Sequence, residues 1–193
     1  MCLNEHMKTR LPKILIRIHF VALTIAILNS LFKNFMAFSP ASEIEFGIKI
    51  LIVISGLILF FFYLKPFKKI NTYFSIYAIA GIFLIIGLIF RGIFGALIIS
   101  IILFPIIPNV KEFENNGVII STPFQGFMAP CCSYQIKERQ LLIFERDYGI
   151  FELEGEGPID FETMNINQSE SEILLTYSTD FDKGIVKSKI VKR

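Results

Sequence analysis

Histidine is scarce in this chain of 193 residues, which has only His6 and His19. No histidine follows residue 19, and the sequence contains no G-x-S-x-G, Walker-type glycine loop or H-E-x-x-H motif. These motifs supply the nucleophile, the phosphate cradle and the zinc ligands of common hydrolases and nucleotide-dependent enzymes. We therefore expect a protein that is not an enzyme, with no catalytic, cofactor-binding or metal-binding residues and no cofactor.

Cysteine is also scarce, because Cys2, Cys131 and Cys132 are the only three. Three thiols do not make a disulfide framework, and an isolated adjacent pair lacks the four spaced ligands of a zinc site. A disulfide between neighbours is strained, and the cytosol keeps thiols reduced. The favoured interpretation is one thiol packed at a sheet edge and the other near the surface. Redox chemistry or lipid modification of the pair is the alternative.

Acidic residues are nearly absent before residue 109 and gather after it. Glu152, Glu154 and Glu156 alternate on one face of an expected strand, and Asp160 and Glu162 follow. Such a cluster could hold calcium, but the spacing is not that of an EF-hand loop. Acidic side chains on the wet face of a strand are ordinary, so we favour a solvated face.

Hydrophobic residues dominate what is present, at 53% of the chain with a mean hydropathy of +0.60. They concentrate between residues 14 and 108. The charge divides at the same place, with ten basic and three acidic residues up to 108, and nine basic and fourteen acidic residues afterwards. Basic residues that border apolar runs set membrane orientation, and they do not form a nucleic-acid-binding surface.

The apolar half predicts a membrane region over residues 1–108. Residues 73–107 are too long for one span, because 35 residues of helix would measure ~52 Å against a hydrocarbon core of ~30 Å. The run is broken by a single charge, Arg91, followed by a glycine. We interpret Arg91 as a hairpin tip; a functional charge inside the membrane is the alternative. Four spans result, at about 14–38, 46–64, 73–90 and 93–107, and the short fourth could instead be re-entrant.

The basic flanks predict the orientation. Four basic residues precede or enter the first span, and Lys65, Lys68 and Lys69 follow the second, whereas the opposite loops offer only Lys33 and Arg91. The positive-inside rule then places both termini in the cytoplasm. An uncleaved first span is preferred to a signal peptide because no small-x-small cleavage site follows it. A composition rich in Ile, Lys and Asn and lacking Trp suggests a bacterial inner membrane protein.

After the membrane region, residues 109–193 alternate as half-buried strands do. The fold class expected is a four-helix transmembrane bundle of two hairpins followed by a small antiparallel all-β C-terminal domain. Glycines in "RDYG" (146–149) and "DKG" (182–184) indicate hairpin turns. The expected strands are 117–121, 133–139, 141–146, 150–154, 159–166, 172–178 and 185–191.

Two functions remain open. In the first, the spans anchor a cytosolic β domain that binds a protein partner or stabilises an assembly, through a sheet edge and the entry loop at 121–132. In the second, the spans act as a small transporter, channel subunit or immunity-type protein through Arg17, His19, Asn29 and Arg91, and loss of activity in an Arg91→Ala variant would favour it. Asn29 with Ser30, and Ala96 with Ser100, are otherwise typical of helix packing. Beyond the lipid bilayer, the partner is unidentified and is not nucleic acid.

Overall fold

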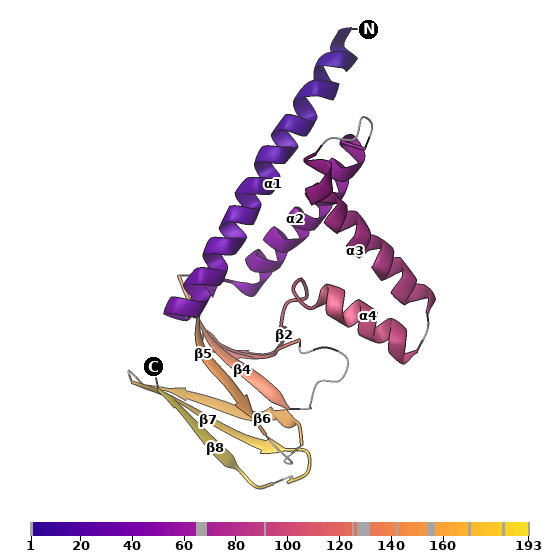
Figure 1. Cartoon of the computed structure of the whole chain (residues 1–193). Helices are drawn as coiled ribbons and strands as arrows, with labels where there is room; N and C mark the ends of the chain where they lie inside the picture. The colour runs from indigo at the N-terminus through magenta and orange to yellow at the C-terminus, as the bar shows by residue number, and fades with distance from the viewer. Residues whose placement is uncertain are drawn as a thin grey trace. The chain divides into compact units, whose positions relative to one another are not determined.

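The computed structural model describes residues 2–64, 69–90, 92–124, 126, 132–141, 143–153, 157–169, 171–182 and 184–192, with side chains from residue 10 onward. The chain divides into two compact units. The helical unit comprises Met1–Ser30 and Glu43–Ile107, and the β unit comprises Leu31–Ser42 and Pro108–Arg193. The β unit therefore includes a segment that lies between the first two helices in the sequence (Figure 1).

Four helices occupy the described part of the first half: α1 (Cys2–Met36), α2 (Ser42–Phe62), α3 (Asn71–Ile89) and α4 (Ile93–Leu103). Arg10–Met36 within α1, together with all of α2 and α3, is long and apolar enough to cross a membrane. Helix α4 has 11 residues, about 16 Å at ~1.5 Å per residue, and a span needs ~20 residues. The structure thus supports three candidate spans, and the predicted fourth is not confirmed.

The break between α3 and α4 falls where the sequence predicts it. Helix α3 ends at Ile89, and Gly92 has a φ of +101° that side chains disfavour. Arg91, the predicted hairpin tip, lies outside the described residues. The closest approach of the two helices is at Gly95, where an added Cβ would lie 2.4 Å from the carbonyl oxygen of Gly87. The predicted small-residue stripe, Ala96 and Ser100, is only half-buried.

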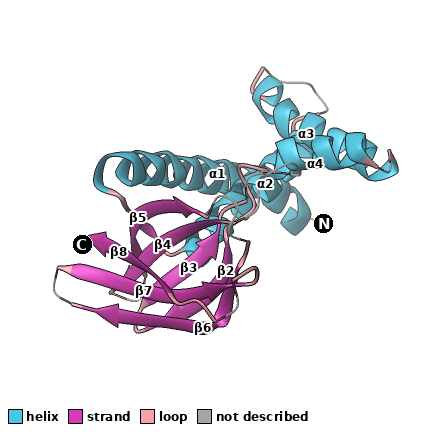
Figure 2. Cartoon of the chain, turned by 90° about the horizontal axis from the view of Figure 1, so that it is seen from below, coloured by secondary structure: helices cyan, strands magenta, loops and turns pink. Residues whose placement is uncertain are grey.

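The β unit contains two antiparallel sheets, so the prediction of an antiparallel all-β C-terminal part is confirmed (Figure 2). The strand order is β1-β5-β4-β3-β2 in the first sheet and β6-β7-β8 in the second. Two strands, β1 and β2, were not expected from the sequence. The strands are β1 (Phe38–Pro40), β2 (Val110–Asn115), β3 (Val118–Thr122), β4 (Ser133–Gln140), β5 (Phe144–Glu152), β6 (Ile159–Gln168), β7 (Glu172–Thr179) and β8 (Lys187–Lys192).

The core of the β unit takes side chains from both sheets, which makes the unit a small sandwich. Tyr134 of the first sheet joins the two, because its hydroxyl oxygen accepts a hydrogen bond from the Ile159 N–H at 3.1 Å. Burial raises the pKa of Tyr134, since the interior disfavours the phenolate. The rings of Phe113 and Phe161 stack across the sheets at 6.3 Å. The buried core residues are Val118, Ile120, Cys132, Tyr134, Ile136, Phe151, Leu153, Ile159, Met164, Ile166, Ile173, Leu175 and Tyr177.

Of the two predicted hairpin turns, the one at 146–149 is wrong. These residues lie inside β5, where the register steps from Gln135↔Ile150 to Lys137↔Asp147 and leaves β5 with one extra residue. Gly149 does have a positive φ of +98°, so the glycine forms a β-bulge rather than a turn. The chain turns instead between Gln140 and Phe144, where the Ile143 N–H bonds the Leu141 carbonyl at 2.8 Å and residue 142 lies outside the described part. The "DKG" turn is confirmed by the Ile185 N–H bond to the Asp182 carbonyl at 3.1 Å, although residue 183 lies outside the described part.

Candidate functional site

The connection between α1 and α2 is a strand of the larger sheet. Within β1, Phe38 pairs with Arg146, Ser39 with Glu145 and Pro40 with Phe144. Two further backbone bonds extend this pairing, from the Asp147 N–H to the Ala37 carbonyl at 2.7 Å and from the Ala41 N–H to the Ile143 carbonyl at 2.8 Å. Proline, which has no N–H, suits an edge strand. A strand of three residues is too short to show an alternating pattern, so it could not be predicted from the sequence.

A buried ion pair stands where β1 leads into α2. Lys137 and Glu145 are 3% and 2% exposed, and the lysine Nζ lies 3.0 Å from Oε2 of the glutamate. Ser42, the first residue of α2, donates its N–H to Oε1 at 3.3 Å and its hydroxyl to Oε2 at 3.0 Å. The Ser42 hydroxyl also accepts a hydrogen bond from Lys137 at 2.7 Å. Glu145 thus supplies the anion that a helix N-terminus favours.

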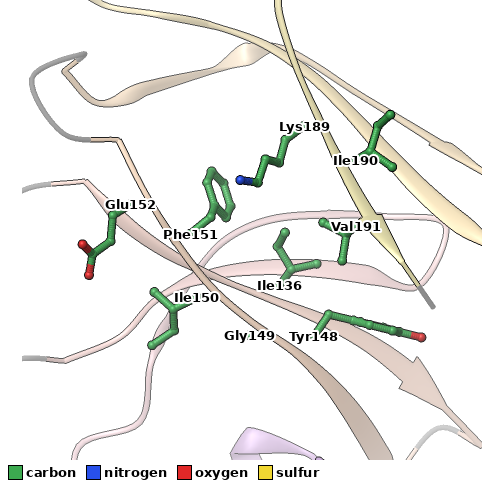
Figure 3. A pocket seen from close by; sticks show the side chains of 9 residues that line it. All are labelled: Ile136, Tyr148, Gly149, Ile150, Phe151, Glu152, Lys189, Ile190 and Val191. Carbon is green, nitrogen blue, oxygen red and sulfur yellow. The ribbon is translucent and has the colours of Figure 1, made fainter.

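A pocket of about 490 Å³ opens between β5 of the first sheet and β8 of the second (Figure 3). This volume lies in the range of ~300–1,000 Å³ typical of small-molecule sites. Figure 3 shows the ammonium group of Lys189 directed toward the ring of Phe151, while the carboxylate of Glu152 is directed away from it. The lining mixes polar and apolar groups, and the inward cation Lys189 suits a ligand that combines an apolar part with an acidic group. The lining residues are Ile136, Tyr148, Gly149, Ile150, Phe151, Glu152, Lys189, Ile190 and Val191.

A second polar cluster is buried among the helices, around His19, which is 0% exposed. Ser55 of α2 lies 2.8 Å from Nδ1 and Tyr73 of α3 lies 3.0 Å from Nε2. The Ser55 hydroxyl also donates to the Ile52 carbonyl at 3.1 Å. Tyr77 lies 3.0 Å from the Tyr73 hydroxyl. The sequence singled out His19 but predicted an interfacial side chain, because burial depends on two later helices.

Of the other polar residues that the sequence singled out in the spans, those that the structure describes do not bond to this cluster. Asn29 is buried, and its Oδ1 has no hydrogen-bond partner among the described residues. It lies ten residues beyond His19 on α1, about 15 Å along the helix axis. Arg17 and Ser30 are exposed. Arg91 and the side chain of His6 lie outside the described part.

The cysteine pair and the acidic cluster are only partly described. Cys132 is 8% exposed and its sulfur is in a disulfide, which corrects the expected free thiol; Cys131 and most of the entry loop lie outside the described residues. Glu152 and Glu162 are exposed, as expected of a solvated face. Glu154 and Glu156 are not described. Within the described ranges, no three His, Cys, Asp or Glu side chains are grouped so as to hold a metal ion.

Comparison with known proteins identifies no relative: no family model, no curated protein and no solved structure matches the chain. Functional assignment therefore depends on the geometry of the two units.

Proposed function

We propose that this chain is a membrane-anchored binding protein with three spans, which displays its sandwich on the side of the membrane opposite the N-terminus. The observation that carries the proposal is the pairing of β1 with β5. Three apolar helices serve as the anchor, and the pocket between β5 and β8 serves as the binding site. The sandwich would then face the exterior, in place of the cytosolic location that the sequence favoured.

The side of the membrane follows from connectivity. If α1 and α2 both cross, the connection between them lies on the side opposite the N-terminus. Strand β1 is in that connection and is hydrogen-bonded to β5, and such bonds of ~2.9 Å cannot reach across a hydrocarbon core of ~30 Å. The sandwich must share the side of β1. A third crossing by α3 returns the chain to that side. Three spans are therefore consistent with a sandwich that lies on the same side as β1.

The positions of the basic residues indicate which side of the membrane is the cytoplasmic one. The N-terminal flank and the α2–α3 connection hold most of the basic residues of the membrane half, and such segments stay in the cytoplasm. The sandwich then lies outside. The disulfide of Cys132 supports the same direction, because disulfides persist in oxidising compartments and are rare in the cytosol.

Topology reporters test this placement. We expect a reporter that is active only outside, such as alkaline phosphatase, to be active when fused after Arg193 and inactive when inserted after Phe67. A fluorescent protein that folds only in the cytoplasm should show the reverse pattern. Immunoblots of each fusion control for abundance. Cytoplasmic fluorescence of the fusion after Arg193 would restore the four-span arrangement and contradict the proposal.

The pocket is tested with 4-phenylbutyrate, an aromatic ring joined to a carboxylate. We expect it to bind the full chain in lipid nanodiscs, and the Lys189→Gln variant to bind roughly tenfold more weakly, because a charge-assisted hydrogen bond contributes ~1.5–3 kcal/mol. Calorimetry measures the dissociation constants. Lys192→Gln, on the same strand but outside the pocket lining, is the matched control. Equal binding by both variants, or none by the native chain, would contradict the assigned ligand class.

A further inference from the structure

The turn between β4 and β5 exposes large apolar side chains at one particular place on the β unit. Leu141 is 85% exposed and Ile143 is 51% exposed. Leu141 also has a φ of +51°, a left-handed conformation that Gly or Asn adopts at lower cost than leucine. A turn that faced only water would favour those residues, so the leucine requires another explanation.

The backbone of this turn is tied to the start of a membrane-spanning helix. The Ile143 carbonyl accepts the Ala41 N–H at 2.8 Å, and Ala41 immediately precedes Ser42, where α2 begins. Next to this bond, the rings of Phe38 and Phe144 stack at 4.9 Å. Ile143 therefore lies beside the residue that leads into α2, which is one of the candidate spans.

The end of α1, which leads into β1, adds exposed apolar surface. Phe35 and Met36 are 83% and 65% exposed, and Ala37, which follows them, accepts the Asp147 N–H of β5. Transfer of an apolar side chain from water into the membrane interface is favourable, with a free energy of ~25 cal/mol per Å² of buried surface. The turn and the end of α1 thus both present exposed apolar side chains beside the strand that joins α1 to α2.

We infer that the β4–β5 turn is a lipid-binding loop, whose Leu141 and Ile143 side chains enter the headgroup and acyl-chain boundary of the bilayer. The loop gives the sandwich a membrane contact besides its covalent connections. This inference requires only that α2 is a span beginning at Ser42. It does not depend on which side of the membrane the sandwich occupies. The reporter fusions described above could therefore contradict the proposed side without contradicting the lipid contact, and the experiment below could contradict the lipid contact alone.

The absence of tryptophan from the chain makes a direct test possible. A Leu141→Trp variant carries a single indole, and the full chain is reconstituted in phosphatidylcholine vesicles with or without bromine on the acyl chains near the headgroups. We expect brominated lipid to quench most of the indole emission, and the emission maximum to lie to the blue of an indole in water. Ile143→Trp is a second reporter on the same turn, should the first variant fail to fold.

Phe181→Trp is the matched control. Phe181 is 74% exposed and follows the last residue of β7. The opposite end of β7 lies near Asn116, because the side chain of Gln168, just before β7, donates a hydrogen bond to the Asn116 carbonyl. The indole of the Phe181→Trp variant should emit as in water and remain unquenched by bromine. Emission from both turn variants that is insensitive to brominated lipid would overturn the inference. So would equal quenching of the control, which would indicate adsorption of the whole unit.

Discussion

Replacement of Lys137 by methionine is expected to lower the free energy of unfolding by about 3–5 kcal/mol, the range found when one partner of a buried ion pair is removed. Glu145 would remain 2% exposed with a carboxylate that has lost its closest cation. Arg139 approaches it only to 4.0 Å. Thermal and denaturant unfolding of the full chain in detergent micelles, followed by the circular dichroism of the sheets, measures the change.

Two controls separate the buried pair from a general effect of removing a lysine. The double variant Lys137→Met with Glu145→Leu removes both charges and should recover most of the loss, because two apolar groups of similar size can replace a buried pair. The second control is Lys111→Met, which breaks an exposed pair with Glu114 and should cost under about 1 kcal/mol. A Lys137→Met variant no less stable than Lys111→Met would contradict the expected importance of the buried pair.

Replacement of His19 by alanine should be the second most damaging change, at about 2–5 kcal/mol, as for other large-to-small substitutions in packed interiors. The variant leaves a cavity among three helices and removes one hydrogen-bond partner each from Ser55 and Tyr73, which keep Ile52 and Tyr77. Each hydrogen bond between membrane helices contributes only ~0.6 kcal/mol on average, so lost packing should dominate. The measurement is unfolding by an anionic detergent, followed by the circular dichroism of the helices.

His19→Gln and Thr24→Ala distinguish packing from hydrogen bonding. Glutamine retains a donor and an acceptor and should lose less stability than alanine. Thr24, on the same helix, is exposed and bonds the carbonyl of Phe20, and its replacement should change the stability very little. If His19→Ala unfolds at the same detergent fraction as the native chain, the cluster does not hold the three helices together.

The sequence was most informative where structure is local. The candidate spans and the break near Arg91 were predictable, because apolar length, flanking charges and glycine act within one segment. Gly149 illustrates what a local sequence signal can and cannot predict. Its positive φ was anticipated, yet whether it makes a turn or a bulge depends on the register of β5 against β4, which the residues around Gly149 do not specify by themselves.

The candidate sites depend on contacts that composition does not encode. In the sequence, Lys137 and Glu145 resemble charged residues on the solvent-exposed face of a strand. In the structure they pair with each other next to β1, and Ser42 at the start of α2 bonds to them, so both are buried from water. Strand β1 itself is too short and too apolar to differ from the end of a span. The pocket arises from the bulge in β5 and from the position of β8 as an edge strand, and both are properties of the assembled sheets.

The position of β1 also constrains biosynthesis. This strand is synthesised between two candidate spans, well before its partner β5. The larger sheet can therefore close only after the later part of the polypeptide has reached the same compartment. Until then the edge of β5 has unpaired amide groups, which readily recruit other chains. A fragment starting at Pro108 would keep that edge open permanently, so completion of the larger sheet requires the segment before Pro108 that carries β1.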